Sequence, residues 1–434
     1  MDKVKVVGAG LAGSEAALFL SRQGVKTLLY DIKPDKYTPA HKSEKFAELV
    51  CSNSLKSYDV FGNAAGLLKE EMRLLGSVVM EAASVFSVKA GGALAVDREK
   101  FSAYITDKIR ADENITVISQ EITEIPEDGY TIIATGPLTT APLSENLKQW
   151  TENLYFYDAS APIISAESID MDKAFFGDRY GKGEGDHINC PMTKEEYEAF
   201  YAALLSAERA TLHDFEKSEI FEGCMPVEVM AARGKDTLRF GPLKPVGLDD
   251  PKTGRWAYAT LQLRREDKFG TAYNMVGFQT NLKWSEQKRV FSMIPALQKA
   301  EFLRYGVMHR NTFINSPKSL NPDLSLKKMP NVFIAGQLSG VEGYAESAGS
   351  GILAAIYAER KLKGKPQITL SEETVLGALA RYITTDCKDF QPMNANFGVL
   401  PPLSAIIKDK TERKRAFAER SLEKIKQFIK ETGL

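Results

Sequence analysis

Residues 6–19 read VVGAGLAGSEAALF, so a short apolar stretch enters three spaced glycines and continues as an alanine-rich segment. Gly8 allows a tight turn after a strand, Gly10 lets the backbone approach a pyrophosphate, and Gly13 lets a helix pack close to that strand. The N–H groups at the start of such a helix point toward the ligand, and the helix dipole favours negative charge there. The segment expected to hold the phosphates of a dinucleotide comprises Gly8, Ala9, Gly10, Leu11, Ala12 and Gly13.

Asp31 follows a second apolar stretch, VKTLLY at 25–30, at the distance where dinucleotide-binding folds carry an acid for the ribose hydroxyls. A lone glycine triplet also occurs in structural turns. Here the strand, the glycines, the helix, the second strand and the acid follow in the required order, so the sequence favours a dinucleotide site. An acid at position 31, rather than an arginine, favours a ribose without a 2′-phosphate.

A second half-site near the C-terminus indicates which dinucleotide is bound. Residues 331–337 read NVFIAGQ, an apolar strand that enters a turn, and a helix is expected to begin near Ser347 with small residues in its first turn. This segment and the TIIATG of 131–136 resemble flavoproteins of the glutathione-reductase type and imply FAD, although Gly336-Gln337 stands where many of them have Gly-Asp. The alternative is an ordinary buried helix with a glycine-rich entry. The residues expected at FAD here are Gly136, Gly336, Gln337, Ser350 and Gly351.

The composition limits the classes of function. At 434 residues the chain exceeds the size of a single hydrophobic core, so two domains are expected. Its 44% hydrophobic and 26% charged residues are ordinary for a soluble globular protein, and a net charge of −1 gives no general attraction to nucleic acid or membrane. No signal peptide or transmembrane run is present, so we expect a cytoplasmic protein without membrane attachment. The four cysteines are too widely spaced for a disulfide scaffold or a CxxC metal site, so no metal is expected.

The order of elements predicts an α/β fold in two domains. A Rossmann-like FAD-binding domain of the glutathione-reductase type is expected from residues 1–150 and 326–434, because both ends of the chain contribute strands to it. Residues 151–325 are expected to form an inserted α+β domain for the substrate or RNA, with one clear helix that starts at the capping box of Thr193 and Glu196. Apolar residues near the C-terminus have helical spacing, which predicts a terminal helix exposed to solvent.

Six blocks of sequence point to one family. The blocks are TPAH at 38–41, ELVCSNSLK at 48–56, FEGCMPVEVMAARGKDTLRFGPLKPVGL at 221–248, GVMHRNTFINSP at 306–317, AGQLSGVEGYAESAGSGILA at 335–354 and MNANFGVLPPL at 393–403. They resemble bacterial folate- and FAD-dependent tRNA (uracil-5-)-methyltransferases over essentially the whole chain, and the blocks that contain Cys51 and Cys224 are specific to that family. Larger flavoproteins that modify wobble uridines share the opening fingerprint and the late block. They carry a long C-terminal extension, which argues against them.

The resemblance implies methylation of C5 of a uridine in RNA, by default the T-loop uridine of tRNA, with 5,10-methylenetetrahydrofolate as carbon donor. Reduced FAD would carry and reduce the methylene group, and NAD(P)H would restore reduced FAD. Uracil C5 becomes nucleophilic only after a thiolate adds to C6. The resemblance makes one of Cys51 and Cys224 this nucleophile and the other an acid/base partner at C5; we favour Cys224 as nucleophile, with the exchange of roles left open. His309 is expected to stack on the folate pterin.

Other interpretations stay open on sequence alone. The same chemistry could act on ribosomal RNA, or the chain could be a flavin oxidoreductase, a thiol-disulfide enzyme, or an RNA-binding protein with structural FAD. The choice between NADH and NADPH and the oligomeric state are not predicted. Cys190 and Cys387 are expected in the core, and no role is assigned to His41, His187 or His213. A local surface for RNA phosphates could be formed by Arg233, Lys235, Arg239, Lys244, Arg264, Arg265 and Lys283.

Overall fold

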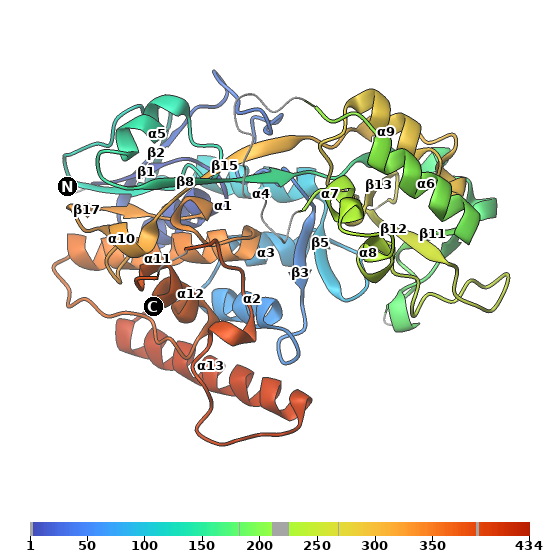
Figure 1. Ribbon diagram of the computed structural model, residues 1–434. Helices are drawn as coiled ribbons and strands as arrows, with labels where there is room; N and C mark the ends of the chain where they lie inside the picture. The colour runs from blue at the N-terminus through green and yellow to red at the C-terminus, as the bar shows by residue number, and fades with distance from the viewer. Residues whose placement is uncertain (1–2, 182, 211–224, 268, 388–389) are drawn as a thin grey trace.

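The computed structural model describes residues 3–181, 183–210, 225–267, 269–387 and 390–434. At its centre is a six-stranded sheet in the order β16-β17-β7-β1-β2-β6, in which all neighbours are parallel except β16 (Figure 1). The strands are β1 (Lys3–Val7), β2 (Lys26–Asp31), β6 (Ile115–Ser119), β7 (Tyr130–Ile133), β16 (Ser325–Leu326) and β17 (Met329–Ile334). Val6 pairs with Leu29 on one side and Ile132 on the other, and all three side chains are buried in one hydrophobic core together with residues of α1 (Leu11–Arg22) and α11 (Tyr344–Leu362). The expected α/β, Rossmann-like fold is confirmed.

Helices from both ends of the chain pack on this sheet. The further elements of this part are α1 (Leu11–Arg22), β3 (Ser54–Ser57), α2 (Ala64–Leu74), α3 (Val78–Val85), β4 (Ser87–Val88), β5 (Ala93–Val96), α4 (Arg98–Ala111), α5 (Ala141–Leu147), α10 (Ser316–Ser319), α11 (Tyr344–Leu362), α12 (Val375–Thr384) and α13 (Lys410–Thr432). A Cβ at Gly351 of α11 would overlap the carbonyl oxygen of Ala12 in α1, so the glycine permits the close approach of these two helices. α11 begins at Tyr344 rather than near Ser347, because Gly343 has a φ of +120° and directs the chain into the helix earlier than expected.

The inserted part, to the right in Figure 1, is built on a second sheet that is antiparallel throughout, in the order β10-β11-β12-β13-β9-β14. Its elements are β9 (Ile163–Ser165), β10 (Phe175–Phe176), β11 (Ile188–Met192), α6 (Lys194–Ser206), α7 (Val227–Ala232), α8 (Thr237–Phe240), β12 (Ala259–Arg265), β13 (Ala272–Met275), α9 (Trp284–Phe291) and β14 (Phe302–Arg304). The capping box predicted for α6 is confirmed: the Glu196 N–H donates to Thr193 Oγ1 at 3.3 Å, and the Thr193 N–H donates to the Glu196 carboxylate at 2.7 Å.

Each sheet has its own hydrophobic core. The buried residues of the core in the inserted part lie between Ala161 and Ala300, whereas Phe313 and Leu324 belong to the core around the parallel sheet. A ribbon of two antiparallel strands, β8 (Asn153–Ala159) and β15 (Met308–Ile314), connects the two parts (Figure 1). Residues at the ends of this ribbon therefore lie where the two parts meet.

The terminal helix α13 is not simply exposed to solvent, as the sequence suggested. Its residues Ala418, Ser421, Ile425 and Phe428 are buried, and the Ser421 hydroxyl donates to the carboxylate of Glu71 in α2. The same carboxylate accepts the first N–H groups of α12, from Val375 at 2.8 Å and Leu376 at 2.9 Å. One buried glutamate thus joins three helices, and its burial raises its pKa to about 7.

Two cysteines, Cys190 and Cys387, were expected in the core, but they differ in burial. Cys190 in β11 is fully buried, as expected, and burial raises the pKa of its thiol. Cys387 is exposed, so the expectation is wrong for this residue. Within the described ranges, no helix has the length and apolar character needed to cross a membrane.

Candidate functional site

Each of the three glycines after β1 is explained by a different feature of the structure. Gly8 has a φ of +100°, and a Cβ there would lie 2.6 Å from the carbonyl oxygen of Ala134. A Cβ at Gly13 would overlap the Gly8 carbonyl oxygen, so this glycine lets α1 pack on the turn. A Cβ at Gly10 would have no protein atom within 4 Å. Gly10 therefore leaves space at the N-terminus of α1, where a pyrophosphate would bind.

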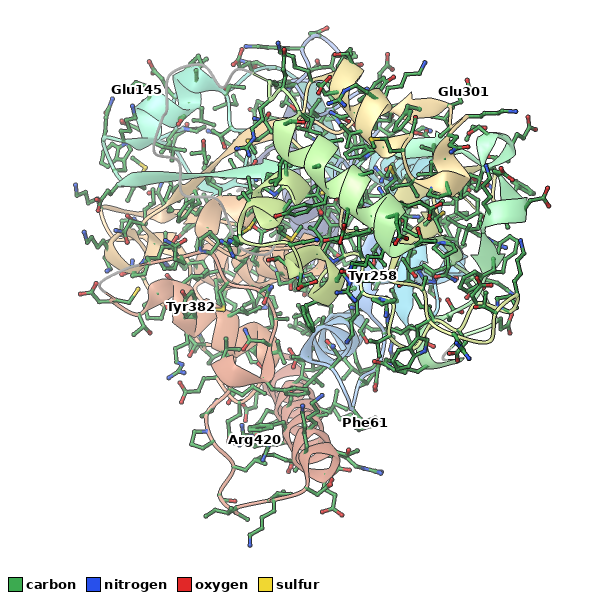
Figure 2. All side chains as sticks on the ribbon, turned by 45° about the vertical axis from the view of Figure 1, so that its right-hand side comes forward. Phe61, Glu145, Tyr258, Glu301, Tyr382 and Arg420 are labelled. Carbon is green, nitrogen blue, oxygen red and sulfur yellow. The ribbon has the colours of Figure 1, made fainter. Side chains whose placement is uncertain are left out.

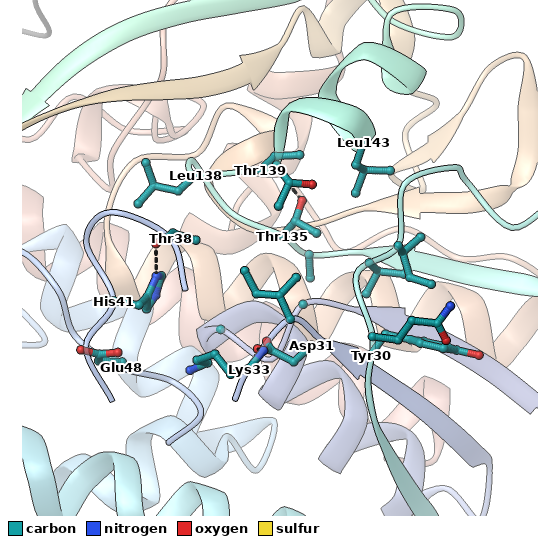
Figure 3. Close-up of a pocket in the computed structure, with 18 residues that line it drawn as sticks. Tyr30, Asp31, Lys33, Thr38, His41, Glu48, Thr135, Leu138, Thr139 and Leu143 are labelled. Carbon is teal, nitrogen blue, oxygen red and sulfur yellow. Dashed lines mark hydrogen bonds between the residues drawn. The ribbon is translucent and has the colours of Figure 1, made fainter. Parts of the chain in front are cut away.

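Asp31 lies in a cavity of about 670 Å³ that also includes Gly8 and Gly10, here called the Asp31 cavity (Figure 3). Its carboxylate is held by two backbone donors, the Ala9 N–H at 2.7 Å and the Lys33 N–H at 2.9 Å. A buried carboxylate fixed in this way has a set orientation. It has the geometry of an acceptor for hydroxyl groups of a ligand at the end of β2.

His41, which the sequence left without a role, also lines the Asp31 cavity (Figure 3). Its Nδ1 lies 2.6 Å from Thr38 Oγ1, and both residues belong to the TPAH block. Burial, with the nearby positive charge of Lys33, lowers the pKa of His41. Burial also lowers the pKa of Lys33 itself. A neutral imidazole can form a hydrogen bond with a ligand without adding charge, and the TPAH block was the signal that could have identified it.

A second cavity of about 1,060 Å³ surrounds Cys51 and is here called the Cys51 cavity. The two cavities share Leu138 in their walls. Gly136, with a φ of +71°, lies between Thr135 of the first wall and Pro137 of the second. The walls of the Cys51 cavity come from the chain around β3, the ends of the β8–β15 ribbon, the inserted part and the start of α11. One elongated ligand can therefore extend from Asp31 to Cys51.

The surroundings of Cys51 are positively charged. The guanidinium groups of Arg98, Arg264 and Arg304 all interact electrostatically with Cys51. The carboxylate of Glu266 offsets part of this charge and lies 2.7 Å from Arg98 Nε. Positive charge beside a cysteine favours the thiolate, which is the reactive form.

Hydrogen bonds fix the backbone around Cys51. The N–H groups of Cys51 and Ser52 both donate to the hydroxyl oxygen of Tyr344, at 2.8 and 3.1 Å. Arg264 donates to Ser52 Oγ at 2.6 Å, and the Cys51 thiol donates to the carbonyl oxygen of Ala159 at 3.9 Å. Burial, and then the interaction with Cys51, raises the pKa of Tyr344. No signal in the sequence indicated that Tyr344, Arg98 or Arg304 belongs to this site, because nothing local connects them with Cys51. Arg264 was expected on a surface for RNA phosphates instead.

The late glycine-rich segment contributes to the Cys51 cavity and to the contact between helices. Gln337 lines the Cys51 cavity and donates to the Glu342 carboxylate. The Gly336 N–H donates to Ser350 Oγ at 2.7 Å, which ties the end of β17 to α11. Gly351 packs against Ala12 of α1. The side chains of Leu11 and Ala12 are buried in the hydrophobic core. These contacts by themselves explain Ser350 and Gly351 without a ligand.

Two predicted site residues cannot be placed by their side chains. Cys224 lies outside the described residues. His309 is described only by its backbone, which pairs with Asp158 across the β8–β15 ribbon. In the described part of the chain, no three His, Cys, Asp or Glu side chains gather as a metal site would require.

Four members of the predicted cationic surface are buried or paired with acidic side chains. Arg264 is buried next to Cys51 rather than exposed to RNA. The remaining members with ion pairs are Lys235, with Glu198 at 2.6 Å, Arg239, with Asp236 at 2.7 Å, and Lys283, with Glu208 at 2.5 Å. Their acidic partners offset the charge that a phosphate would meet.

Comparison with known proteins places the chain in a family. Residues 3–366 match the family model of glucose inhibited division protein A. The protein named methylenetetrahydrofolate–tRNA-(uracil-5-)-methyltransferase TrmFO from Bacillus cytotoxicus is 57% identical over 98% of both chains, and that from Caldicellulosiruptor bescii is 58% identical over 97% of both. Aquifex aeolicus GidA has the same fold, with a TM-score of 0.73 and 17% identity over all of this chain and 73% of that one. The chain therefore belongs to the glucose inhibited division protein A family, in the group of TrmFO proteins.

Proposed function

We propose that this protein methylates C5 of a uridine in tRNA, with 5,10-methylenetetrahydrofolate as carbon donor. The observation that carries the proposal is the similarity to proteins with that printed name over nearly the whole of both chains. The position of Cys51 in a cavity that adjoins the Asp31 cavity supports it. We further propose the T-loop uridine as the target and NAD(P)H as the source of electrons.

The two adjoining cavities fit FAD. Asp31 would accept the ribose hydroxyls, the space at Gly10 would admit the pyrophosphate, and the start of α11 with Gln337 would meet the ring. Bound FAD would supply the electrons that convert a methylene group to a methyl group. His41 would add one hydrogen bond in the Asp31 cavity, and we propose His309 as a contact of the folate pterin.

The cysteines would divide the work at the uracil ring. Cys224 would add to C6, which makes C5 nucleophilic toward the one-carbon unit. Cys51 would then accept the proton from C5, and the C5–C6 double bond would form again as the Cys224 thiolate leaves. The positive surroundings of Cys51 support this role, because they favour a thiolate that can take up a proton.

The direct experiment incubates the purified protein with unmodified tRNA, labelled methylenetetrahydrofolate and NADPH. Nucleoside mass spectrometry should find labelled 5-methyluridine in the T-loop, and none when the folate is omitted. Ribosomal RNA fragments serve as the competing substrate. Label in ribosomal RNA alone would contradict the choice of tRNA. Oxidation of NADPH without label in any RNA would favour a plain flavin oxidoreductase.

A further inference from the structure

We propose that the substrate RNA docks on a surface formed by the first turns of α13 and the loop after β3, beside the Cys51 cavity. This rests on the proposed function, because an RNA is far larger than the cavity and must also contact the protein outside it. The α13 surface is defined by Tyr58, Phe61, Lys408, Lys410, Arg413 and Arg415. In Figure 1, α13 runs beneath α2 and α12, and Figure 2 labels Phe61 close to α13.

The charge of this surface suits a polyanion. Residues 406–415 contain five basic and two acidic side chains, a net charge of +3 in a chain whose overall charge is −1. One of the acids, Asp409, caps the helix by accepting the Glu412 N–H at 2.8 Å. Of the five basic residues in 406–415, Lys408, Lys410 and Arg413 are exposed and have no ion pair with an acidic side chain among the described residues. A local excess of unpaired positive charge is what RNA phosphates require.

Aromatic side chains are interleaved with these cations. Tyr58 is 58% exposed and Phe61 is 44% exposed. The Arg415 guanidinium lies 5.6 Å from the centre of the Phe61 ring, and Lys414 Nζ donates to the Gly62 carbonyl oxygen at 2.8 Å. These contacts hold the loop against α13. Exposed rings beside cations allow base stacking and phosphate contacts together, as RNA-binding surfaces do.

Two segments connect the α13 surface with the rim of the Cys51 cavity. Lys56, in β3, lines the cavity and leads directly into the loop that contains Phe61. The Ala395 N–H donates at 3.0 Å to Glu346, another residue of the cavity wall. Two residues further on, Phe397 stacks on Phe417 of α13 with ring centres 5.8 Å apart. An RNA on this surface can therefore present one flipped uridine to Cys51 while its backbone stays on α13.

The test compares two sets of three charge-removing substitutions. The α13 variant is K408Q/K410Q/R413Q, and the control variant is K235Q/K283Q/R289Q, whose three cations have ion pairs with Glu198, Glu208 and Glu286. Binding of unmodified tRNA is measured by fluorescence anisotropy at several salt concentrations. The α13 variant should bind at least about tenfold more weakly near 0.1 M salt, and the slope of log affinity against log salt should fall by about 2. The control variant should change affinity by less than about twofold.

The FAD content and thermal midpoint of each variant show that the fold is intact. Unchanged tRNA affinity in the α13 variant overturns the proposed surface, as does a loss confined to the control variant, which would place RNA on the inserted part. The two proposals fail separately. If wild-type protein binds tRNA through α13 but methylates no uridine, the proposed function is wrong and the surface stands. If the wild type methylates tRNA and the α13 variant binds tRNA normally, only the proposed docking surface is contradicted.

Discussion

The Asp31 cavity and the Cys51 cavity share a wall at Leu138, but different parts of the chain build them. The Asp31 cavity depends on the backbone: it needs glycine at positions 8 and 10, and N–H groups hold its carboxylate. The Cys51 cavity depends on side chains that come together from distant segments. Tyr344, which binds the Cys51 N–H, is 293 positions away along the chain.

This difference says which substitutions each site can accept. A site built from backbone is disrupted by an added side chain at its glycines. A site built from side chains loses reactivity when one functional group is removed, while its shape persists. Substitutions should therefore separate binding of the dinucleotide from the reaction at Cys51.

The largest effect is expected for Gly10→Val. The protein has room for the new side chain, so the thermal midpoint of the apoprotein should stay unchanged, but the side chain would occupy the place of the pyrophosphate. The purified variant should be colourless, with FAD affinity lowered at least about 100-fold. Absorbance at the flavin bands and calorimetry measure the two properties. Gly13→Val is the matched control. Unlike Gly10→Val, it should lose stability, because its Cβ would overlap the Gly8 carbonyl oxygen. A yellow Gly10→Val protein would show that the space does not serve a dinucleotide.

Cys51→Ala should have the opposite profile. FAD content should match the wild type, while methylation of tRNA should fall at least about 100-fold, because the group proposed to take the C5 proton is absent. Cys387→Ala, at an exposed cysteine, is the control and should stay active. Normal methylation by Cys51→Ala would remove this thiol from the mechanism.

RNA with 5-fluorouridine separates the roles of the cysteines. Fluorine at C5 leaves no proton to remove, so the product of thiolate addition to C6 should accumulate as a gel-stable protein–RNA adduct. Cys224→Ala should form no adduct, whereas Cys51→Ala should still form some, because its step follows addition. The reverse pattern would exchange the two roles.

Arg264→Gln should have an intermediate effect. It removes one of the positive charges around Cys51 and the hydrogen bond to Ser52, so less thiolate is available. We expect turnover to fall about tenfold with FAD content unchanged, measured as initial rates of 5-methyluridine formation. Arg255→Gln, at an exposed arginine of the inserted part, controls for loss of charge alone. An unaltered rate in Arg264→Gln would show that the charge around Cys51 does not support the reaction.

The smallest effect concerns the support of the Asp31 cavity. Glu15 of α1 accepts hydrogen bonds at the start of α3, from the Val78 and Val79 N–H groups at 3.2 and 2.9 Å, and burial raises its pKa from 4.5 to about 7. Its contribution to stability is therefore complete below pH 4.5 and is lost as the pH rises to about 7, up to about 3 kcal/mol. Between pH 5 and 8, the free energy of unfolding should depend less on pH for Glu15→Gln than for the wild type. Glu99→Gln, at an exposed ion pair, should keep the wild-type dependence of the unfolding free energy on pH. The same pH dependence in all three proteins would contradict the raised pKa of Glu15.

The backbone-built region was predictable because its signals are local in the sequence. Gly8 and Gly13 could be understood from their spacing, and Thr193 with Glu196 marked the start of α6 three residues apart. The start of α11 was placed three residues late because small residues were taken as its first turn, while the positive φ of Gly343 sets the start. The roles of individual site residues and the limits of the two domains stay predictions.

The side-chain-built region could not be predicted in the same way. Arg98, Arg264 and Arg304 lie in different elements, and Arg264 and Arg304 come to Cys51 from the inserted part, far away along the chain. Ser421 on the buried face of α13 donates to Glu71, whose burial no local pattern indicated. A lone arginine or glutamate in a sequence is normally a surface residue, so its position in the fold is needed before it can be interpreted.

The central claim is that one cofactor occupies both cavities and brings its reactive ring to Cys51. A crystal structure of the protein with FAD tests it most directly. We predict density for the ribose against the Asp31 carboxylate, for the pyrophosphate at Gly10, and for the ring in van der Waals contact with the walls of the Cys51 cavity. Density for the ring outside the Cys51 cavity, with the adenosine end still at Asp31, would contradict the account.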